Sequence, residues 1–204
     1  MDTTDACKRL HILLNGATEL LQWPSNGLYF FQENAEIWGH DPNQNIPRLT
    51  RCGSHTKDGR LKARATEHFS QNSNGSVVIK HFGHALAKRS GNNADAHWGG
   101  SGSRHCSSCK VLVENTRTFL RNNVQEIIVG FSKDWTRAEK IAIGILSHCS
   151  LCRCSKTWGG QLAKNISISS GKIWNDADLG YVPTMDDMEW FFRNAKVAGK
   201  YARR

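Results

Sequence analysis

Residues 27–53 read GLYFFQENAEIWGHDPNQNIPRLTRCG, with a strand-like segment on each side of a polar loop. The first five residues, Gly27 to Phe31, are rich in aromatic side chains and follow an asparagine, which is typical of a β-strand. Residues 38–47 hold two of the four prolines together with two asparagines and an aspartate, so they predict a loop. Residues 48–53 predict a second short strand that pairs with the first. The stretch therefore predicts a β-hairpin.

The rest of the chain alternates between helical and strand patterns. Apolar residues at helical spacing predict helices over residues 5–21, 59–71, 76–89, 109–120, 134–146 and about 184–195. Residues 124–131 form the clearest strand pattern, whereas residues 90–103 and 149–172 predict loops. These elements predict an α+β fold with a small, mostly antiparallel central sheet flanked by helices. We expect a single domain over residues 1–204, with a core at about 26–176, an N-terminal helix, and a C-terminal helix followed by a basic tail.

Composition excludes several classes of protein. No apolar run approaches the 18 residues of a membrane-spanning helix, so no membrane partner is expected. The first residues lack a basic segment followed by a long apolar one, which disfavours a secretion signal. Seven cysteines without such a signal favour reduced thiols or a metal site, and thus a cytoplasmic protein.

Charge is distributed unevenly along the chain. The formal net charge is +9, but residues 1–50 carry three basic and six acidic side chains. Residues 51–89 carry eight basic side chains against two acidic ones. This pattern predicts one cationic surface, for which a polyanion such as nucleic acid is the natural partner.

Two cysteine pairs have the spacing of zinc ligands. They are Cys106-x2-Cys109 and Cys149-x2-Cys152, about 40 residues apart. The pairs either form one structural zinc site or are free thiols, and the sequence leaves both readings open. Cys7 is not expected to take part.

Three side chains are candidates for chemistry on a phosphate. Arg64 and His68 are four residues apart, so they share one face of the predicted helix. Arg64 offers a planar guanidinium group that can bind a phosphate, and His68 offers a titratable imidazole ring. Alternatively, they form a solvated surface pair. Glu139 lies beside the buried face of its helix, where it either holds a divalent cation or complements the helix dipole.

Five short motifs follow one another along the chain in an order that is typical of one protein family. They are Gly27-Leu28-Tyr29, Arg51-Cys52-Gly53, Arg64-x3-His68, Glu139 within Arg137-Ala138-Glu139-Lys140, and Asn175 within Ser170-Gly171-Lys172-Ile173-Trp174-Asn175. In this order they resemble the GIY-YIG nuclease superfamily, and the Arg-x3-His motif resembles its restriction-endonuclease-like branch. The resemblance covers most of the chain, from about Asn26 to Asp176.

The resemblance implies a role for each residue. Tyr29 would be the general base or would position the attacking water, and His68 would hydrogen-bond the tyrosine or the water. Glu139 would hold one Mg²⁺ or Mn²⁺. Arg64 would bind the scissile phosphate, and Asn175 would make a supporting polar contact.

The chain departs from the family pattern at the second triplet, where Arg51 replaces the usual tyrosine. A cation at this position either orients the phosphate or lowers the pKa of Tyr29. The departure is equally compatible with a degenerate, poorly active member. His55 is a candidate for part of the missing role.

The function implied by the resemblance is that of an endodeoxyribonuclease. We expect metal-dependent hydrolysis of phosphodiester bonds in double-stranded DNA, at specific sequences as in type II restriction enzymes. A repair or mobile-element endonuclease is one alternative, and a zinc-stabilised nucleic-acid-binding protein without catalysis is another. Recognition of a palindrome would favour a homodimer. DNA-binding candidates on the basic stretch are Lys62, Lys80, Lys88 and Arg89.

Overall fold

A four-stranded antiparallel sheet forms the centre of the structure, a computed structural model that describes residues 1–40, 45–69, 76–92 and 107–202. The strands are β1 (Gly27–Ile37), β2 (Pro47–Gly53), β3 (Val124–Gly130) and β4 (Lys196–Tyr201), in the order β2-β1-β3-β4. The α+β class and the antiparallel sheet predicted from the sequence are therefore confirmed.

The predicted hairpin is present, and β1 is its central strand. Tyr29 pairs with Gly53 and Phe31 with Arg51, while β1 also pairs along its length with β3. The first seven residues of β1 are all buried, because neighbouring strands and helices cover both faces of this strand. This burial explains why aromatic residues run consecutively there instead of alternating with polar ones.

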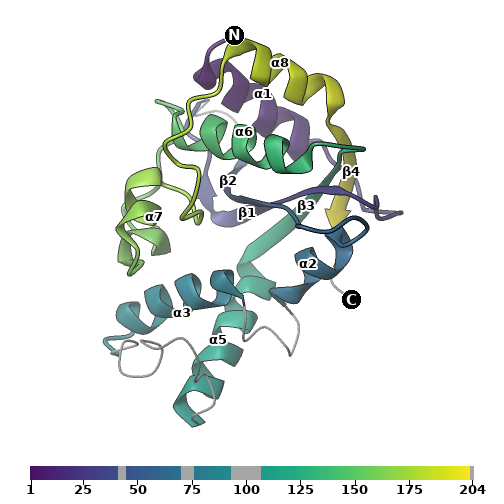
Figure 1. The fold of residues 1–204 in the computed structure, drawn as a ribbon. Helices are drawn as coiled ribbons and strands as arrows, with labels where there is room; N and C mark the ends of the chain where they lie inside the picture. The colour runs from purple at the N-terminus through teal and green to yellow at the C-terminus, as the bar shows by residue number, and fades with distance from the viewer. Residues whose placement is uncertain (41–44, 70–75, 93–106, 203–204) are drawn as a thin grey trace.

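Helices cover both faces of the sheet (Figure 1). One face carries α1 (Thr3–Asn15), α6 (Trp135–Ser147) and α8 (Met185–Asn194), and the other carries α2 (Leu61–Glu67), α3 (Val77–Arg89) and α5 (Ser107–Asn123). The short helices η2 (Gly159–Leu162) and α7 (Ile166–Gly171) follow α6. No helix in the described part of the chain is long and apolar enough to cross a membrane.

Two hydrophobic cores result, one on each side of the sheet. Leu28 and Phe30 belong to the α1/α6/α8 core, whereas Tyr29 and Phe31 belong to the α2/α3/α5 core. The alternation follows from the two-residue period of a strand. It places Tyr29 on the side of α2, the helix that carries Arg64.

The predicted extent of the first helix is wrong. That helix was expected over residues 5–21 but runs over Thr3–Asn15. In the basic C-terminal stretch, residues 196–201 form strand β4, which the sequence pattern does not predict. Gly199 weakens the strand pattern of β4, but the structure requires a glycine there. A Cβ atom at this position would lie only 2.7 Å from the backbone of Leu20. Pairing with β3 therefore outweighs the local preference of these residues.

The outer edges of the sheet are covered by other segments of the chain. At β2, the Trp174 N–H donates to the Thr50 carbonyl at 2.6 Å. At β4, the Lys200 N–H donates to the Thr18 carbonyl at 2.7 Å, and the Leu20 N–H donates to the Lys200 carbonyl at 2.9 Å. The outward backbone groups of Thr50 on β2 and of Lys200 on β4 are thus already paired.

Candidate active site

Tyr29 lies at the start of a hydrogen-bonded chain of three side chains. Its hydroxyl is 2.8 Å from Nε2 of His68, and Nδ1 of His68 is 2.7 Å from Oγ of Ser76. In the tautomer whose Nδ1–H donates to Ser76, Nε2 accepts a hydrogen bond from the Tyr29 hydroxyl. Both rings are buried, with Tyr29 1% and His68 0% exposed. The arrangement gives the tyrosine proton an acceptor.

Burial and nearby charges set the protonation of this pair. Burial raises the pKa of Tyr29, although the positive charges of Arg51 and Arg64 oppose the rise. Burial also lowers the pKa of His68 well below its usual value, and the same two arginines lower it further. Both side chains are therefore neutral at neutral pH, which leaves one ring nitrogen of His68 free to accept the hydrogen bond from the Tyr29 hydroxyl.

Gly53 leaves room for the tyrosine ring to lie across β2. A Cβ atom at position 53 would be only 2.2 Å from the Tyr29 hydroxyl oxygen and 2.3 Å from Cζ. No side chain fits there without displacing the ring. The glycine that ends the second triplet is thus required by the position of Tyr29.

Arg51 and Asn175 both bind backbone groups near this pair. The Arg51 guanidinium donates to the Trp174 carbonyl, and only 7% of the residue is exposed. The Asn175 side chain accepts from the Cys52 N–H at 3.1 Å and donates to the Cys52 carbonyl at 2.7 Å. Asn175 therefore fixes the backbone of β2 at Cys52, the residue after Arg51.

An open pocket lies where β2 ends, between α2 and α6. Its lining residues are Ser54, His55, Thr56, Lys57, Arg60, Arg64, Glu67 and Glu139. Both carboxylate oxygens of Glu139 accept from Ser54, one from the backbone N–H at 3.2 Å and the other from the hydroxyl. Arg64 contacts Glu67 at 2.8 Å and keeps about a third of its side chain exposed. Tyr29 lies behind the pocket instead of lining it.

The pocket fits a hard divalent cation. Mg²⁺ is held by one or two carboxylates and keeps several waters, so it needs oxygen donors in an accessible cavity. Glu139 supplies a half-buried carboxylate on α6, and Glu67 supplies a second one on α2. Glu139 would hold the ion, because Glu67 is already paired with Arg64 at 2.8 Å.

Lys57 and Arg60 are functional candidates that the sequence analysis missed. Both are exposed and line the pocket together with Arg64. His55 fixes their loop, because its Nε2 accepts from the Gly27 N–H at 3.2 Å and its Nδ1 donates to the Lys57 carbonyl at 2.7 Å. Both ring nitrogens of His55 are occupied by the backbone, so it does not replace the missing tyrosine.

The basic residues expected to bind DNA do not form one compact cluster. Lys62 is exposed on α2, close in sequence to Arg64. Lys80 and Lys88 are exposed on α3, about 12 Å apart along the helix axis. Arg89 donates to the Thr157 carbonyl at 2.7 Å and lines a different pocket.

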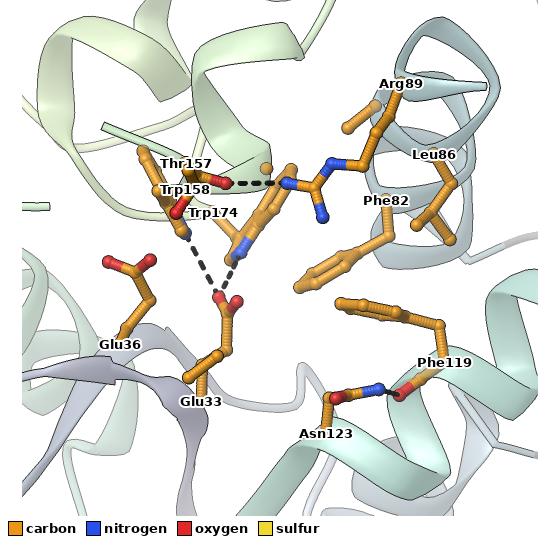
Figure 2. A pocket seen from close by; sticks show the side chains of 13 residues that line it. Glu33, Glu36, Phe82, Leu86, Arg89, Phe119, Asn123, Thr157, Trp158 and Trp174 are labelled. Atoms are coloured by element: carbon orange, nitrogen blue, oxygen red, sulfur yellow. Dashed lines mark hydrogen bonds between the residues drawn. The ribbon is translucent and has the colours of Figure 1, made fainter. Parts of the chain in front are cut away.

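That second pocket has aromatic walls and a buried carboxylate (Figure 2). Phe82 and Trp174 line it, and the indole N–H groups of Trp158 and Trp174 donate to one oxygen of Glu33 at 3.2 and 2.6 Å. Burial raises the pKa of Glu33. The pocket contains none of the residues predicted to act on the phosphodiester bond.

The cysteine pairs do not meet as expected. Cys106 lies outside the described residues, and Cys109 belongs to the α2/α3/α5 core. Cys149 and Cys152 belong to the α1/α6/α8 core, on the opposite side of the sheet. The predicted four-cysteine zinc site is therefore wrong, because Cys109 is disulfide-bonded and lies across the sheet from the second pair.

Instead, Cys149 and Cys152 lie beside Cys7, a residue that was not expected to take part in a metal site. Ligand atoms of Cys7, His11 and Cys152 all lie within 4.8 Å of one another, and so do those of Cys7, His40 and Cys149. A hydrogen bond with Cys7 lowers the pKa of Cys149 to about 6, and a similar bond lowers the pKa of Cys152. The cluster is thus able to hold a metal ion.

Comparison with known proteins agrees with this geometry. The model of the GIY-YIG domain family matches residues 4–189, a longer stretch than the expected core of residues 26–176. No curated protein and no solved structure shows a match. Because the family match covers most of the chain, the protein belongs to the GIY-YIG domain family and is a nuclease of that metal-dependent, DNA-cleaving superfamily.

Proposed function

We propose that this nuclease is a metal-dependent endonuclease that cuts double-stranded DNA at specific sequences, as type II restriction enzymes do. The observation that carries the proposal is the Tyr29–His68 hydrogen bond of 2.8 Å, beside a pocket with three cations and two carboxylates. A buried proton acceptor next to a cationic, oxygen-lined pocket suits hydrolysis of a phosphodiester bond.

The pocket residues would bind the scissile phosphate and stabilise charge on it. Arg64, Arg60 and Lys57 provide cations for the phosphate oxygens as charge builds in the transition state. A Mg²⁺ or Mn²⁺ ion at Glu139 would neutralise the phosphate and assist the leaving oxygen. Ser54 orients the carboxylate by donating to both of its oxygens.

Tyr29 and His68 would remove the proton from the attacking water. The water oxygen forms the new bond to phosphorus while its proton passes to the Tyr29 oxygen, and the tyrosine proton passes to Nε2 of His68. The bond from phosphorus to the leaving oxygen breaks in the same displacement. Because Tyr29 is 1% exposed, the proposal requires that bound DNA shift residues 54–60 and admit the water.

The partners follow from the same proposal. Double-stranded DNA would cross the pocket and contact Lys62 on α2, with Lys80 and Lys88 on α3 as more distant phosphate contacts. We propose a homodimer for a palindromic target. We also propose a cytoplasmic location, because five cysteines are free, although Cys109 is disulfide-bonded.

The experiment is incubation of the purified chain with a plasmid and a long linear duplex in Mg²⁺. Discrete bands with uniform ends support a restriction-like enzyme, whereas cleavage confined to branched DNA supports the repair alternative. Glu139→Gln should abolish cutting while DNA binding persists, and Glu189→Gln, an exposed change on α8, should cut normally. Wild-type protein that binds DNA without cutting under any divalent cation contradicts the proposal and favours the non-catalytic alternative.

A further inference from the structure

Four side chains from three distant parts of the chain meet in the α1/α6/α8 core. Cys7 comes from α1, His40 follows β1, and Cys149 and Cys152 follow α6. Nε2 of His40 is 2.9 Å from Sγ of Cys149, and the sulfur atom of Cys7 belongs to both groups of ligand atoms that lie within 4.8 Å. We propose that Cys7, His40, Cys149 and Cys152 bind one structural zinc ion.

The choice of His40 over His11 follows from their hydrogen bonds. Nδ1 of His11 is 2.9 Å from the Cys7 carbonyl, and its Nε2 accepts from the Leu49 N–H at 3.0 Å. One neutral tautomer satisfies both bonds, so the ring has no lone pair left for a metal. Nε2 of His40 instead faces the sulfur of Cys149, and its half-buried ring stacks on Trp38 at 4.8 Å.

The ligand chemistry favours zinc over harder cations. Three thiols and one imidazole form a Cys₃His set, which is a common structural zinc site, whereas Mg²⁺ and Ca²⁺ require oxygen donors. Tetrahedral zinc holds such ligand atoms roughly 3.5–4 Å apart. Cys7, His40 and Cys149 already lie within 4.8 Å of one another, and Cys152, which lies within the same distance of Cys7, would turn from His11 toward them to complete the set. Each thiol that still carries a proton releases it when the metal binds.

The backbone around the second cysteine pair supports this assignment. The Cys152 N–H donates to Sγ of Cys149 at 3.3 Å, a bond that favours the thiolate and fixes its direction. Cys7, Cys149 and Cys152 are all free and buried, so no disulfide competes for the sulfur atoms. Gly39 also lies against this segment, because a side chain there would be 3.0 Å from the Leu151 carbonyl.

The site would act on stability and not on the reaction itself. It lies on the opposite side of the sheet from Tyr29 and joins α1 to the segment after α6, about 140 residues later in the chain. Since α6 also carries Glu139, the ion would hold the helix that positions the catalytic carboxylate. This inference does not depend on the proposed cleavage specificity.

The test is elemental analysis of the untagged full-length chain, purified under reducing conditions without chelator. We expect about one zinc per chain in the wild type, falling to below about 0.2 in Cys149→Ser and in His40→Ala. His11→Gln should keep its zinc, and so should Cys154→Ser, which changes a half-exposed cysteine in the same segment. Cys109→Ser should also keep it, since that residue lies across the sheet.

Cobalt substitution tests the ligand set without any variant that might misfold. Wild-type protein loaded with Co²⁺ should show a tetrahedral spectrum with thiolate charge-transfer bands, and chelation of the native metal should lower the melting temperature. Wild-type protein that contains no zinc and binds no Co²⁺ while its thiols remain reduced would overturn the proposal. Loss of zinc in Cys109→Ser or His11→Gln, but not in His40→Ala, would overturn it equally.

Discussion

Replacing Gly53 by alanine should damage catalysis more than it damages the fold. The added Cβ would be 2.2 Å from the Tyr29 hydroxyl oxygen, whereas ordinary contacts begin at 3.4 Å, so the ring has to move by about 1.2 Å. Overpacking of this kind costs about 1–3 kcal/mol of stability. A displacement of about 1 Å at a reacting group costs on the order of 100-fold in rate, and here it also stretches the bond to His68.

The assay combines the rate of plasmid cleavage in Mg²⁺ with chemical denaturation of the same sample. Gly180→Ala is the matched control, because Gly180 is exposed and an added Cβ would meet nothing within 4 Å. That variant should match the wild type in both measurements. If Gly53→Ala cuts at the wild-type rate, the position of the Tyr29 hydroxyl does not matter to the reaction and the assigned site is wrong.

Four further outcomes are expected. Tyr29→Phe should fold, at a cost of about 1–3 kcal/mol for the lost bond to His68, but its single-turnover cleavage rate should collapse. Arg51→Ala should also cut slowly if the arginine replaces the second tyrosine, and a near-normal rate would make it only a structural contact to the backbone. Burial holds the pKa of His68 well below 6.5, so in mildly acidic solution the unfolded chain binds a proton that the folded chain does not. The free energy of unfolding should therefore fall as the pH drops below about 6.5, by about 1.4 kcal/mol per pH unit until the pKa of the folded state is reached. His68→Gln should flatten this pH dependence in denaturant titrations. Lys62→Glu should weaken DNA binding and reduce its salt dependence, whereas Lys8→Glu, on the opposite side of the sheet, should leave both unchanged in fluorescence titrations.

The hairpin could be predicted from the sequence because its determinants are local. Aromatic runs, a proline-rich loop and a second short strand all lie within residues 27–53, and the structure pairs Tyr29 with Gly53 as this pattern indicates. Strand β4 could not be predicted in the same way. Val197 and Tyr201 favour a strand, but the glycine, the alanine and the two lysines of β4 do not. Pairing with β3 and contact with the backbone of Leu20 therefore decide the extended conformation.

The candidate functional residues were also predictable only where their sequence signals are local. The order of motifs predicted Tyr29, His68 and Glu139, and the structure brings the first two into hydrogen-bond contact and Glu139 into the adjacent pocket. The metal cluster escaped prediction because Cys7 and Cys149 are far apart in the chain. Spacing rules describe ligands on one loop, whereas this cluster forms only when α1 packs beside α6.

Coverage of both edge strands also determines how copies of the protein can associate. An open strand edge invites strand addition from a neighbour, which leads to aggregation or to sheets that continue across a dimer. Here the residues that follow α7 pair with β2, and residues 18–20 pair with β4. At these positions neither edge strand has unpaired backbone groups for a strand of another copy. Two copies that meet on a DNA palindrome would therefore associate through helices or loops, with their sheets remaining separate.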